Sequence, residues 1–203
     1  MKIITDFPVA YESHDHIVPK GTANDNTQGM AFVQRVKELA GDQKIKVADL
    51  GCSGGALVKN FINEGIEAIG IEGSDYSQKN ARAEWATIPD NLFTADITKP
   101  FFIVDGTEIG QCDIITAWDV LEHIHENDLG VLISNIRNNL KNNGLFVASV
   151  ATFADEHYHV TLKEKDWWLD LFKKYRMIDA GPEYFSDAQM VRGSSFFLTL
   201  KRV

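Results

Sequence analysis

Three glycines interrupt an apolar stretch in the first half of the chain. The stretch "VADLGCSGGALVKNF", residues 47–61, passes from a strand-like run through Gly51, Gly54 and Gly55 into an amphipathic segment. Glycine lacks a Cβ atom, so the backbone can turn sharply there and approach a ligand closely. A strand, a glycine turn and a helix serve three chemistries: binding a dinucleotide, presenting a serine nucleophile, and binding a sulfonium cofactor that carries a nucleoside.

The dinucleotide interpretation requires a G-x-G-x-x-G turn. Counted from Gly51, the second and third glycine positions hold Ser53 and Ala56. The second glycine is the one that lets the backbone approach a pyrophosphate, so the match fails where it matters most. Glu72 lies about 20 residues beyond the turn, where a ribose-binding acid is expected, but other nucleoside-binding proteins share this feature.

The serine interpretation rests on residues 51–55, which satisfy G-x-S-x-G with Ser53 as the nucleophile. In α/β-hydrolases several strands and an oxyanion-hole loop precede this turn. Here the turn follows the first strand of the expected sheet, and the sequence contains no HGGG-like run. The order of the motifs therefore argues against a serine hydrolase.

Strand and helix signals alternate along the chain, which predicts a sheet with helices on both faces. Strands are expected at 45–51, 68–73, 91–97, 112–119, 145–151, 177–180 and 194–203, with a hairpin or loop insertion at 101–110. Helices are expected at 29–40, 56–64 and 77–85, from 129 to a stop at the Asn-Asn-Gly of 142–144, and after a capping box formed by Thr161 and Glu164. We expect a single domain: residues 1–44 form an N-terminal arm and helix that act as a lid, 45–150 the cofactor-binding core, and 151–203 a substrate-side helix and terminal strands.

Five stretches carry a family resemblance in the correct order. "VADLGCSGGALV" resembles the first motif of class I S-adenosylmethionine-dependent methyltransferases, and "IGIEGSD", "LFTADITKPF", "CDIITAWDVLEHI" and "LKNNGLFVASV" resemble the strands that follow it. The resemblance implies an α/β, Rossmann-like fold with a seven-stranded, mostly parallel sheet and an antiparallel last strand, and S-adenosyl-L-methionine as the cofactor. The chain also resembles a bacterial subgroup associated with glycan biosynthesis, which points to O-methylation of a sugar or small-molecule hydroxyl.

The resemblance assigns cofactor contacts to residues at the ends of strands. Asp49 would orient the methionine portion, Glu72 would accept from both ribose hydroxyls, and Asp96 would accept from the adenine amino group. The full expected set is Asp49, Gly51, Cys52, Ser53, Gly54, Gly55, Glu72, Gly73, Asp96, Ile97 and Asp119. Asp49 as a helix cap and Asp96 as a turn residue are the structural alternatives.

In the family that the chain resembles, the loop after the fourth strand borders both cofactor and acceptor. The resemblance therefore makes Asp119, Glu122 and His123, in the segment "WDVLEHIHEND", the candidate catalytic residues. The preferred general base is His123, because an imidazole titrates near neutral pH. The alternative is that His123 only holds the loop in place.

Polar residues outside the core pattern are candidates for contacts with the acceptor: His14, His16, Asn26 and His157. A metal site could be built from His14, His16 and Asp25, or from His157 and His159. Short histidine pairs without a third fixed ligand are weak metal signals, so the sequence predicts no metal.

Composition narrows the functional class. The formal charge of -9 and the scattered basic residues disfavour nucleic acid as a partner, and no apolar run has the roughly 20 residues of a membrane span. Cys52 and Cys112 are expected as buried thiols of a cytoplasmic protein. The sequence predicts a methyltransferase acting on a small molecule or sugar, with a homodimer as a possible assembly. A non-catalytic cofactor-binding subunit, an NAD-dependent oxidoreductase and a serine hydrolase are the alternatives.

Overall fold

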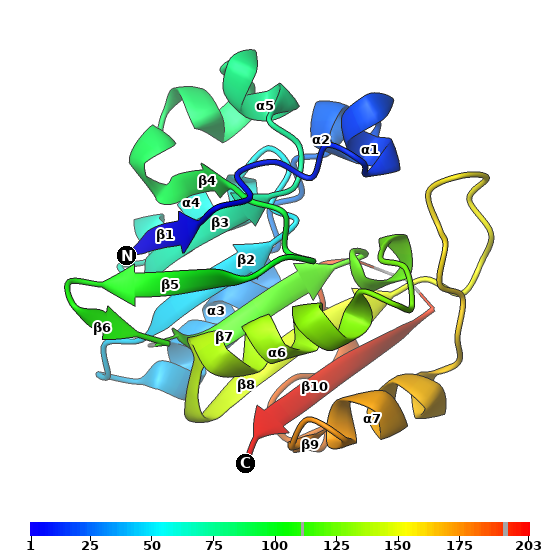
Figure 1. Ribbon diagram of the computed structural model, residues 1–203. Helices are drawn as coiled ribbons and strands as arrows, with labels where there is room; N and C mark the ends of the chain where they lie inside the picture. Colours follow the sequence, from blue (N-terminus) through cyan, green and yellow to red (C-terminus); the bar gives the residue numbers. More distant parts are fainter. Residues whose placement is uncertain (111, 193–194) are drawn as a thin grey trace.

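A seven-stranded sheet forms the centre of the protein (Figure 1). The computed structural model describes residues 1–110, 112–192 and 195–203. In the sheet order β4-β3-β2-β7-β8-β10-β9, the strands are β2 (Lys46–Leu50), β3 (Glu67–Glu72), β4 (Leu92–Thr94), β7 (Cys112–Trp118), β8 (Leu140–Val150), β9 (Met177–Asp179) and β10 (Phe196–Arg202). Neighbouring strands from β4 to β8 are parallel, whereas β10 runs antiparallel to β8 and β9. The predicted fold class is confirmed.

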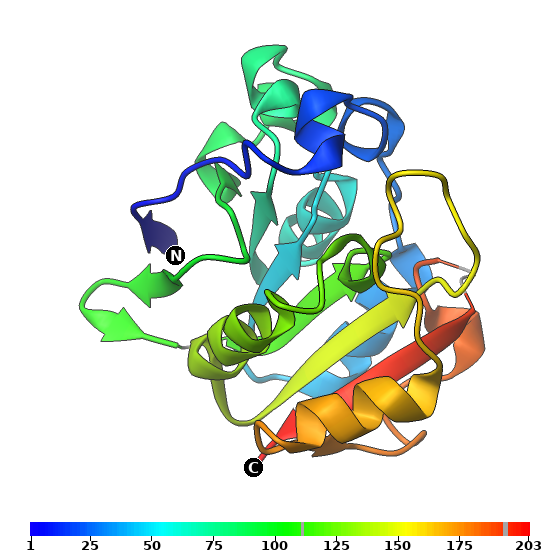
Figure 2. The same ribbon diagram turned by 45° about the vertical axis from the view of Figure 1, so that its right-hand side comes forward.

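Alternate residues of the central strands enter two separate cores, because side chains of a strand point to opposite faces. In β2, Val47 joins one core and Ala48 joins the other. Helices α3 (Met30–Ala40) and α4 (Ala56–Asn63) cover the first core, and α6 (Leu129–Asn139) and α7 (Lys165–Lys173) cover the second (Figure 2). This layering holds the carboxyl ends of the parallel strands together at one edge of the sheet.

A second, three-stranded sheet lies beside the main one. It consists of β1 (Lys2–Thr5), β5 (Phe101–Asp105) and β6 (Glu108–Ile109), in the order β1-β5-β6. The expected hairpin is confirmed in β5 and β6, and Gly106 adopts a φ of 60° in its turn. Strand β1 was missed by the sequence analysis, which treated the arm as polar and irregular. It pairs antiparallel with β5, with Ile3 opposite Ile103.

Short helical segments complete the chain: α1 (His14–Ile17), α2 (Gly21–Asn24), α5 (Tyr76–Lys79), and the 3-10 turns η1 (Ala83–Ala86), η2 (Pro89–Asn91), η3 (Leu121–His123) and η4 (Asp187–Gln189). The helix expected at 77–85 is wrong as a continuous element. Ala81 and Ala83 have φ values of 46° and 48°, outside the helical region, and so separate α5 from η1.

Two further boundary predictions were wrong for identifiable reasons. Helix α6 ends at Asn139, whose side-chain oxygen accepts a hydrogen bond of 2.6 Å from the Ile103 amide, and β8 begins at the next residue. The Asn-Asn-Gly of 142–144 therefore lies inside β8 instead of ending the helix. Thr161 forms no capping box, since its hydroxyl donates to the Ile124 carbonyl at 2.6 Å. Of the expected last strand, Ser194 lies outside the described residues.

Within the described part of the chain, no helix combines the length and the apolar character needed to cross a bilayer.

Candidate functional site

Three acidic residues meet at the carboxyl edge of the main sheet. Asp49 lies near the end of β2, Glu72 ends β3, and Asp119 follows β7 directly. Strands β3, β2 and β7 are adjacent in the sheet, so the acids are brought together although they are distant in the chain. Open α/β sheets bind their ligands at this edge.

The glycine turn after β2 needs glycine for two physical reasons. Gly51 and Gly55 adopt φ values of 72° and 88°, which residues with a Cβ atom rarely adopt. A Cβ atom on Gly51 would lie 2.4 Å from Val120 Cγ2, and one on Gly54 would lie 2.3 Å from Asn26 Oδ1. The turn therefore packs directly against the loop after β7 and against the N-terminal arm.

Glu72 joins two loops of the site. It is 7% exposed. Its Oε2 accepts a hydrogen bond of 2.7 Å from the Ser53 amide, and its Oε1 accepts one of 3.3 Å from the Ser74 amide. Burial raises the pKa of Glu72 to about 7, against the opposing effect of these amides. Each carboxylate oxygen retains a lone pair for a further donor.

Asp49 is slightly more buried than Glu72 and accepts a hydrogen bond of 2.6 Å from Thr116 Oγ1. Burial raises its pKa to about 7. The alternative role of Asp49 as a helix cap is wrong, because Gly55 is the N-cap of α4 and the Ala56 amide donates to Asn26 Oδ1 at 3.0 Å.

Asp96 and its neighbours lie beyond β4. Asp96 Oδ1 accepts from the amide and the hydroxyl of Thr98 at 2.9 and 2.6 Å, which is the arrangement of a turn residue. Ile97 is buried, and Gly73 accepts a backbone hydrogen bond from Ala10 at 2.8 Å. The buried thiol of Cys52 lies on the turn itself; burial raises its pKa well above the usual value.

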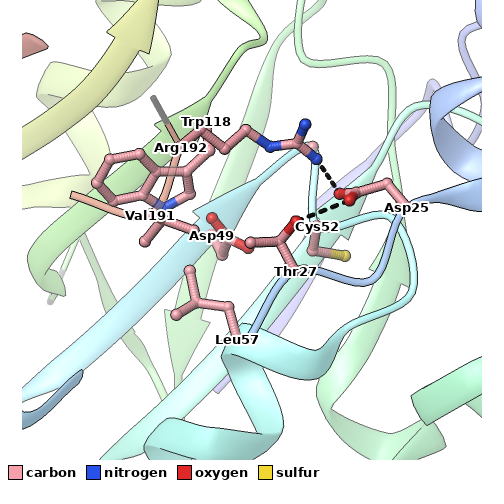
Figure 3. A pocket seen from close by; sticks show the side chains of 9 residues that line it. Asp25, Thr27, Asp49, Cys52, Leu57, Trp118, Val191 and Arg192 are labelled. Atoms are coloured by element: carbon pink, nitrogen blue, oxygen red, sulfur yellow. Dashed lines mark hydrogen bonds and ion pairs between the residues drawn. The ribbon is translucent and has the colours of Figure 1, made fainter. Parts of the chain in front are cut away.

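A small pocket opens between these acids and two segments that cover them. Its lining residues, shown in Figure 3, are Asp25, Thr27, Asp49, Gly51, Cys52, Leu57, Trp118, Val191 and Arg192. Arg192 forms an ion pair with Asp25 of the arm and approaches Asp119 Oδ2 at 3.8 Å. The arm and the segment before β10 therefore meet above the carboxyl ends of β2 and β7.

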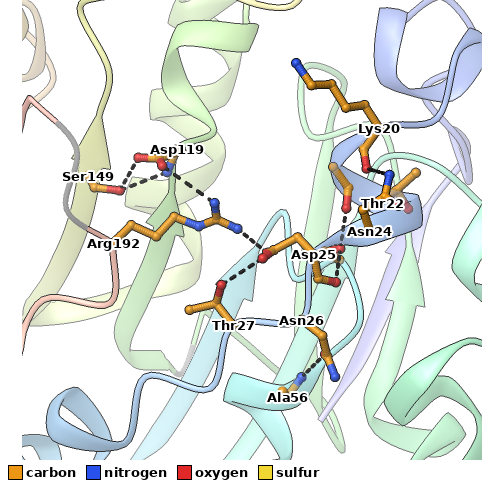
Figure 4. Close-up of polar contacts among 12 residues, drawn as sticks. Lys20, Thr22, Asn24, Asp25, Asn26, Thr27, Ala56, Asp119, Ser149 and Arg192 are labelled. Carbon is orange, nitrogen blue, oxygen red and sulfur yellow. Dashed lines mark hydrogen bonds and ion pairs between the residues drawn. The ribbon is translucent and has the colours of Figure 1, made fainter.

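The arm is bound to the glycine turn by polar contacts, and Figure 4 shows the neighbouring contact between Asn26 of the arm and Ala56. Ser53 Oγ lies 2.8 Å from the Gly21 carbonyl and 2.9 Å from the Asp25 carbonyl. The guanidinium of Arg82 donates to Ser53 Oγ at 2.9 Å and also to the Asp25 carbonyl. These contacts keep residues 21–27 on top of the turn.

Asp119 marks the boundary between the cofactor edge and the candidate acceptor side. It has a φ of 53°, and its Oδ1 accepts a hydrogen bond of 2.5 Å from Ser149 Oγ. Three residues later, the side chain of Glu122 is fully buried. Burial raises the pKa of Glu122 to about 8. Burial, followed by the effect of nearby His159, lowers the pKa of His123 to about 4, so this imidazole is uncharged at neutral pH.

The candidate acceptor residues lie in three places. His14 lies beside His157, with ring centroids 5.3 Å apart, and both are close to Tyr158 in the segment after β8. His16 Nδ1 lies 3.3 Å from Ser74 Oγ, on the loop after β3. Asn26, in the arm, accepts a hydrogen bond from the amide of Ala56 at the start of α4.

Sequence reasoning missed two arginines of the site. Arg82 and Arg192 lie in irregular segments without a periodic pattern, and their partners are distant in the chain. No local pattern in the sequence marks either arginine as part of the site. His159 was weighed only with His157, although its ring lies 4.9 Å from that of His123.

The sheet order and the three strand-end acids around a glycine turn define a class I methyltransferase fold, whose cofactor is S-adenosylmethionine. Residues 26–189 match the family model described as a methyltransferase domain, and the chain belongs to this family. The dinucleotide and hydrolase interpretations of the glycine turn are thereby rejected.

Similarity to individual proteins is more distant. The ubiquinone biosynthesis O-methyltransferase of Psychrobacter cryohalolentis is 33% identical over 81 residues, which are 39% of this chain and 31% of that protein. The solved 1,6-didemethyltoxoflavin-N1-methyltransferase of Burkholderia thailandensis superposes with a TM-score of 0.61 at 12% identity, over 93% of this chain and 84% of its own. Magnesium protoporphyrin IX methyltransferase from Synechocystis PCC 6803 was solved with S-adenosylhomocysteine bound. It superposes with a TM-score of 0.57 at 16% identity, over 86% of this chain and 83% of its own. These structures share the fold. The expected likeness to a glycan-biosynthesis subgroup stays a prediction.

Proposed function

We propose that the protein transfers the methyl group of S-adenosylmethionine to a hydroxyl oxygen of a small-molecule acceptor. The observation that carries the proposal is the junction at Glu72, a buried carboxylate at the end of β3 that also holds the Ser53 amide of the glycine turn. A carboxylate at this place suits a vicinal pair of ribose hydroxyls, because each of its oxygens can accept one of them.

The remaining cofactor contacts follow from their places along the same edge. Asp49 is buried behind the glycine turn, so it suits the ammonium of the methionine portion, directly or through water. Asp96, Ile97 and Gly73 are proposed for the adenine. Asp119 directly follows β7, the strand adjacent to β2, and is proposed to lie where the methionine portion continues toward the acceptor.

The reaction is an in-line displacement. The acceptor oxygen forms a bond to the methyl carbon, the bond between that carbon and the sulfonium sulfur breaks with its electron pair going to sulfur, and S-adenosylhomocysteine leaves. Holding the two reactants in line supplies much of the rate, about 7 to 11 kcal/mol in well-oriented systems. The hydroxyl proton must also be removed. The imidazole of His123, which directly follows Glu122 in η3, is uncharged at neutral pH. One of its ring nitrogens therefore carries no proton, and we propose that this nitrogen accepts the hydroxyl proton.

Two acceptor classes are supported by different observations. The sequence resemblance favours a sugar hydroxyl. The named relatives, ubiquinone biosynthesis O-methyltransferases, favour an acceptor of that pathway, although the matched segment spans about a third of their length. Both are hydroxyl acceptors, so O-methylation is common to them.

Calorimetry tests the cofactor assignment. S-adenosylhomocysteine should bind and NAD should not. Replacing Glu72 by Gln should weaken binding about tenfold or more, because a hydrogen bond to a charged group contributes about 1.5 to 3 kcal/mol. Glu67→Gln is the matched control, since Glu67 begins the same strand at its opposite end and should leave the affinity unchanged. No binding at millimolar concentration, or an equal effect of both substitutions, would refute the proposed site.

The alternative of a non-catalytic subunit is separated by turnover. Release of S-adenosylhomocysteine is measured with sugar nucleotides and with dihydroxylated aromatic acceptors. Turnover above the rate without acceptor supports the enzyme. Cofactor binding with no turnover on either panel favours the partner subunit.

A further inference from the structure

A group of three side chains with metal-binding donors lies beside the methyl-transfer edge. Glu122 and His123 come from the turn η3, and His159 comes from the segment between β8 and α7. Their candidate ligand atoms all lie within 4.8 Å of one another. We call these three residues the His-Glu cluster.

The backbone fixes the two parts of this cluster against each other. The Glu122 carbonyl accepts hydrogen bonds from the amides of Val160 and Thr161, at 2.8 and 3.0 Å. The same segment is tied to the arm by an ion pair between Lys20 and Asp155, at 2.7 Å. In Figure 1 this segment rises from the end of β8 toward α1 and α2. His159 is therefore held next to η3 by contacts that do not involve its own side chain.

Glu122 has a buried oxygen that lacks a hydrogen-bond partner. The residue is 0% exposed. Its Oε1 accepts from the Ala151 amide at 3.0 Å, whereas Oε2 has no partner among the described residues. Buried polar atoms in folded proteins are nearly always paired, and an ionised carboxylate is especially costly without a counter-charge. A bound cation would supply both the partner and the charge.

His159 is oriented as metal-binding histidines usually are. Its Nδ1 lies 2.7 Å from the Phe153 carbonyl, which can only accept a hydrogen bond, so Nδ1 carries the proton. The other ring nitrogen, Nε2, is then free to bind a cation. The ring of His123 stands nearly perpendicular to it, at 84° and 4.9 Å between centroids.

We propose that Glu122, His123 and His159 form a binding site for one divalent transition-metal ion, with zinc as the representative ion. Two imidazoles and one carboxylate suit zinc, iron, cobalt or manganese better than magnesium or calcium, which prefer oxygen ligands. Bonds of about 2.1 Å in a tetrahedral site place ligands about 3.4 Å apart, so the three side chains would draw together by about 1 Å.

Three protein ligands leave a fourth position for a small molecule, as in catalytic zinc sites. If the protein is the O-methyltransferase proposed above, this position suits the acceptor's hydroxyl oxygen, because a bound cation lowers the pKa of an oxygen that it coordinates. His123 would then be a ligand, which replaces the base role proposed for it above, and the proton of the coordinated hydroxyl would pass to water. Metal binding itself does not depend on the proposed function, and it is measured separately.

The test is direct metal uptake. Purified protein is stripped with chelator, dialysed against zinc, and analysed for bound metal; cobalt is used in parallel because its visible spectrum reports the ligand geometry. Wild-type protein should hold one ion per chain. Glu122→Gln and His159→Ala should each raise the dissociation constant at least tenfold.

His125→Ala is the matched control, since His125 is an exposed histidine two residues from His123. It should bind the ion as wild type does. Failure of the wild type to take up zinc or cobalt, or equal binding by wild type and both cluster variants, overturns the site. Equal loss in His125→Ala indicates adventitious binding by surface histidines and overturns it as well. Because Glu122 is fully buried, thermal melting first checks that its variant folds, and His159→Ala, on a partly exposed segment, decides the outcome if it does not.

Discussion

The buried carboxyl of Glu122 should make stability depend on pH in a way that one substitution removes. Burial raises its pKa from 4.5 to about 8; the charge of Asp119 adds to this, whereas the Ala151 amide and Arg192 oppose it. The folded protein therefore holds a proton that the unfolded chain releases near pH 4.5. This contribution to stability is fully present below pH 4.5 and is lost as the pH rises through about 8.

The size of the effect follows from that difference. At about 1.4 kcal/mol per pH unit, a shift of about 3.5 units corresponds to about 5 kcal/mol. Glu122→Gln carries no titrating group at this position, so any constant cost of the amide cancels when two pH values are compared. Relative to this variant, wild type should lose about 5 kcal/mol of unfolding free energy between pH 4.5 and pH 8.5.

Urea denaturation at several pH values in this range, with chelator present, measures the effect. Chelator is needed because a bound cation would stabilise the ionised carboxylate and reduce the loss. Glu12→Gln, at an exposed position of the arm, should follow the wild-type curve. If the unfolding free energies of wild type and Glu122→Gln run parallel over the whole range, then the carboxyl is not held protonated by burial and the reasoning fails.

Three further predictions concern the turn, the covering segments and the core. Gly51→Ala should lower the unfolding free energy by about 2 to 4 kcal/mol, because φ is positive and Val120 occupies the space that the new Cβ atom needs. Gly65→Ala is the control: its φ is also positive, but no atom lies within 4 Å of the new Cβ atom, so the loss should be about 1 kcal/mol. Asp25→Asn weakens the ion pair with Arg192, so stopped-flow Trp fluorescence should show S-adenosylhomocysteine associating severalfold faster; an unchanged rate would mean that this contact does not limit entry. Trp168→Ala should cost about 3 to 5 kcal/mol by urea denaturation, since Trp168 is fully buried under the sheet; a loss below 1 kcal/mol would contradict its place in the core.

The central sheet could be predicted because each strand carries its own local signal. Strands β2, β3 and β7 are apolar runs that end at an acid or a glycine turn, and their order in the chain is that of the resembling family. Strand β1 has only four residues and gains its pairing from β5, far away in the chain, so no local pattern could reveal it.

The candidate site could be predicted to the same extent. Asp49, Glu72 and Asp119 are found from their places at strand ends. Other contacts depend on tertiary packing, which the sequence does not reveal: the hydrogen bond of Ser53 to the arm, the ion pair of Arg192, and the approach of His159 to Glu122. For Asp96 the sequence left two roles open, an adenine contact and a turn residue. Its side chain accepts hydrogen bonds from Thr98, two residues away, as a turn residue does.

The pairing of β1 with β5 also restricts how the arm can move. One end of the arm is held by β1 in the small sheet, and the other continues into α3 on the main sheet. Residues 6–29 are thus anchored by strand pairing at one end and by α3 at the other, in addition to the contacts that hold residues 21–27 on the glycine turn. Removing Lys2–Thr5 should release the first anchor and loosen the arm.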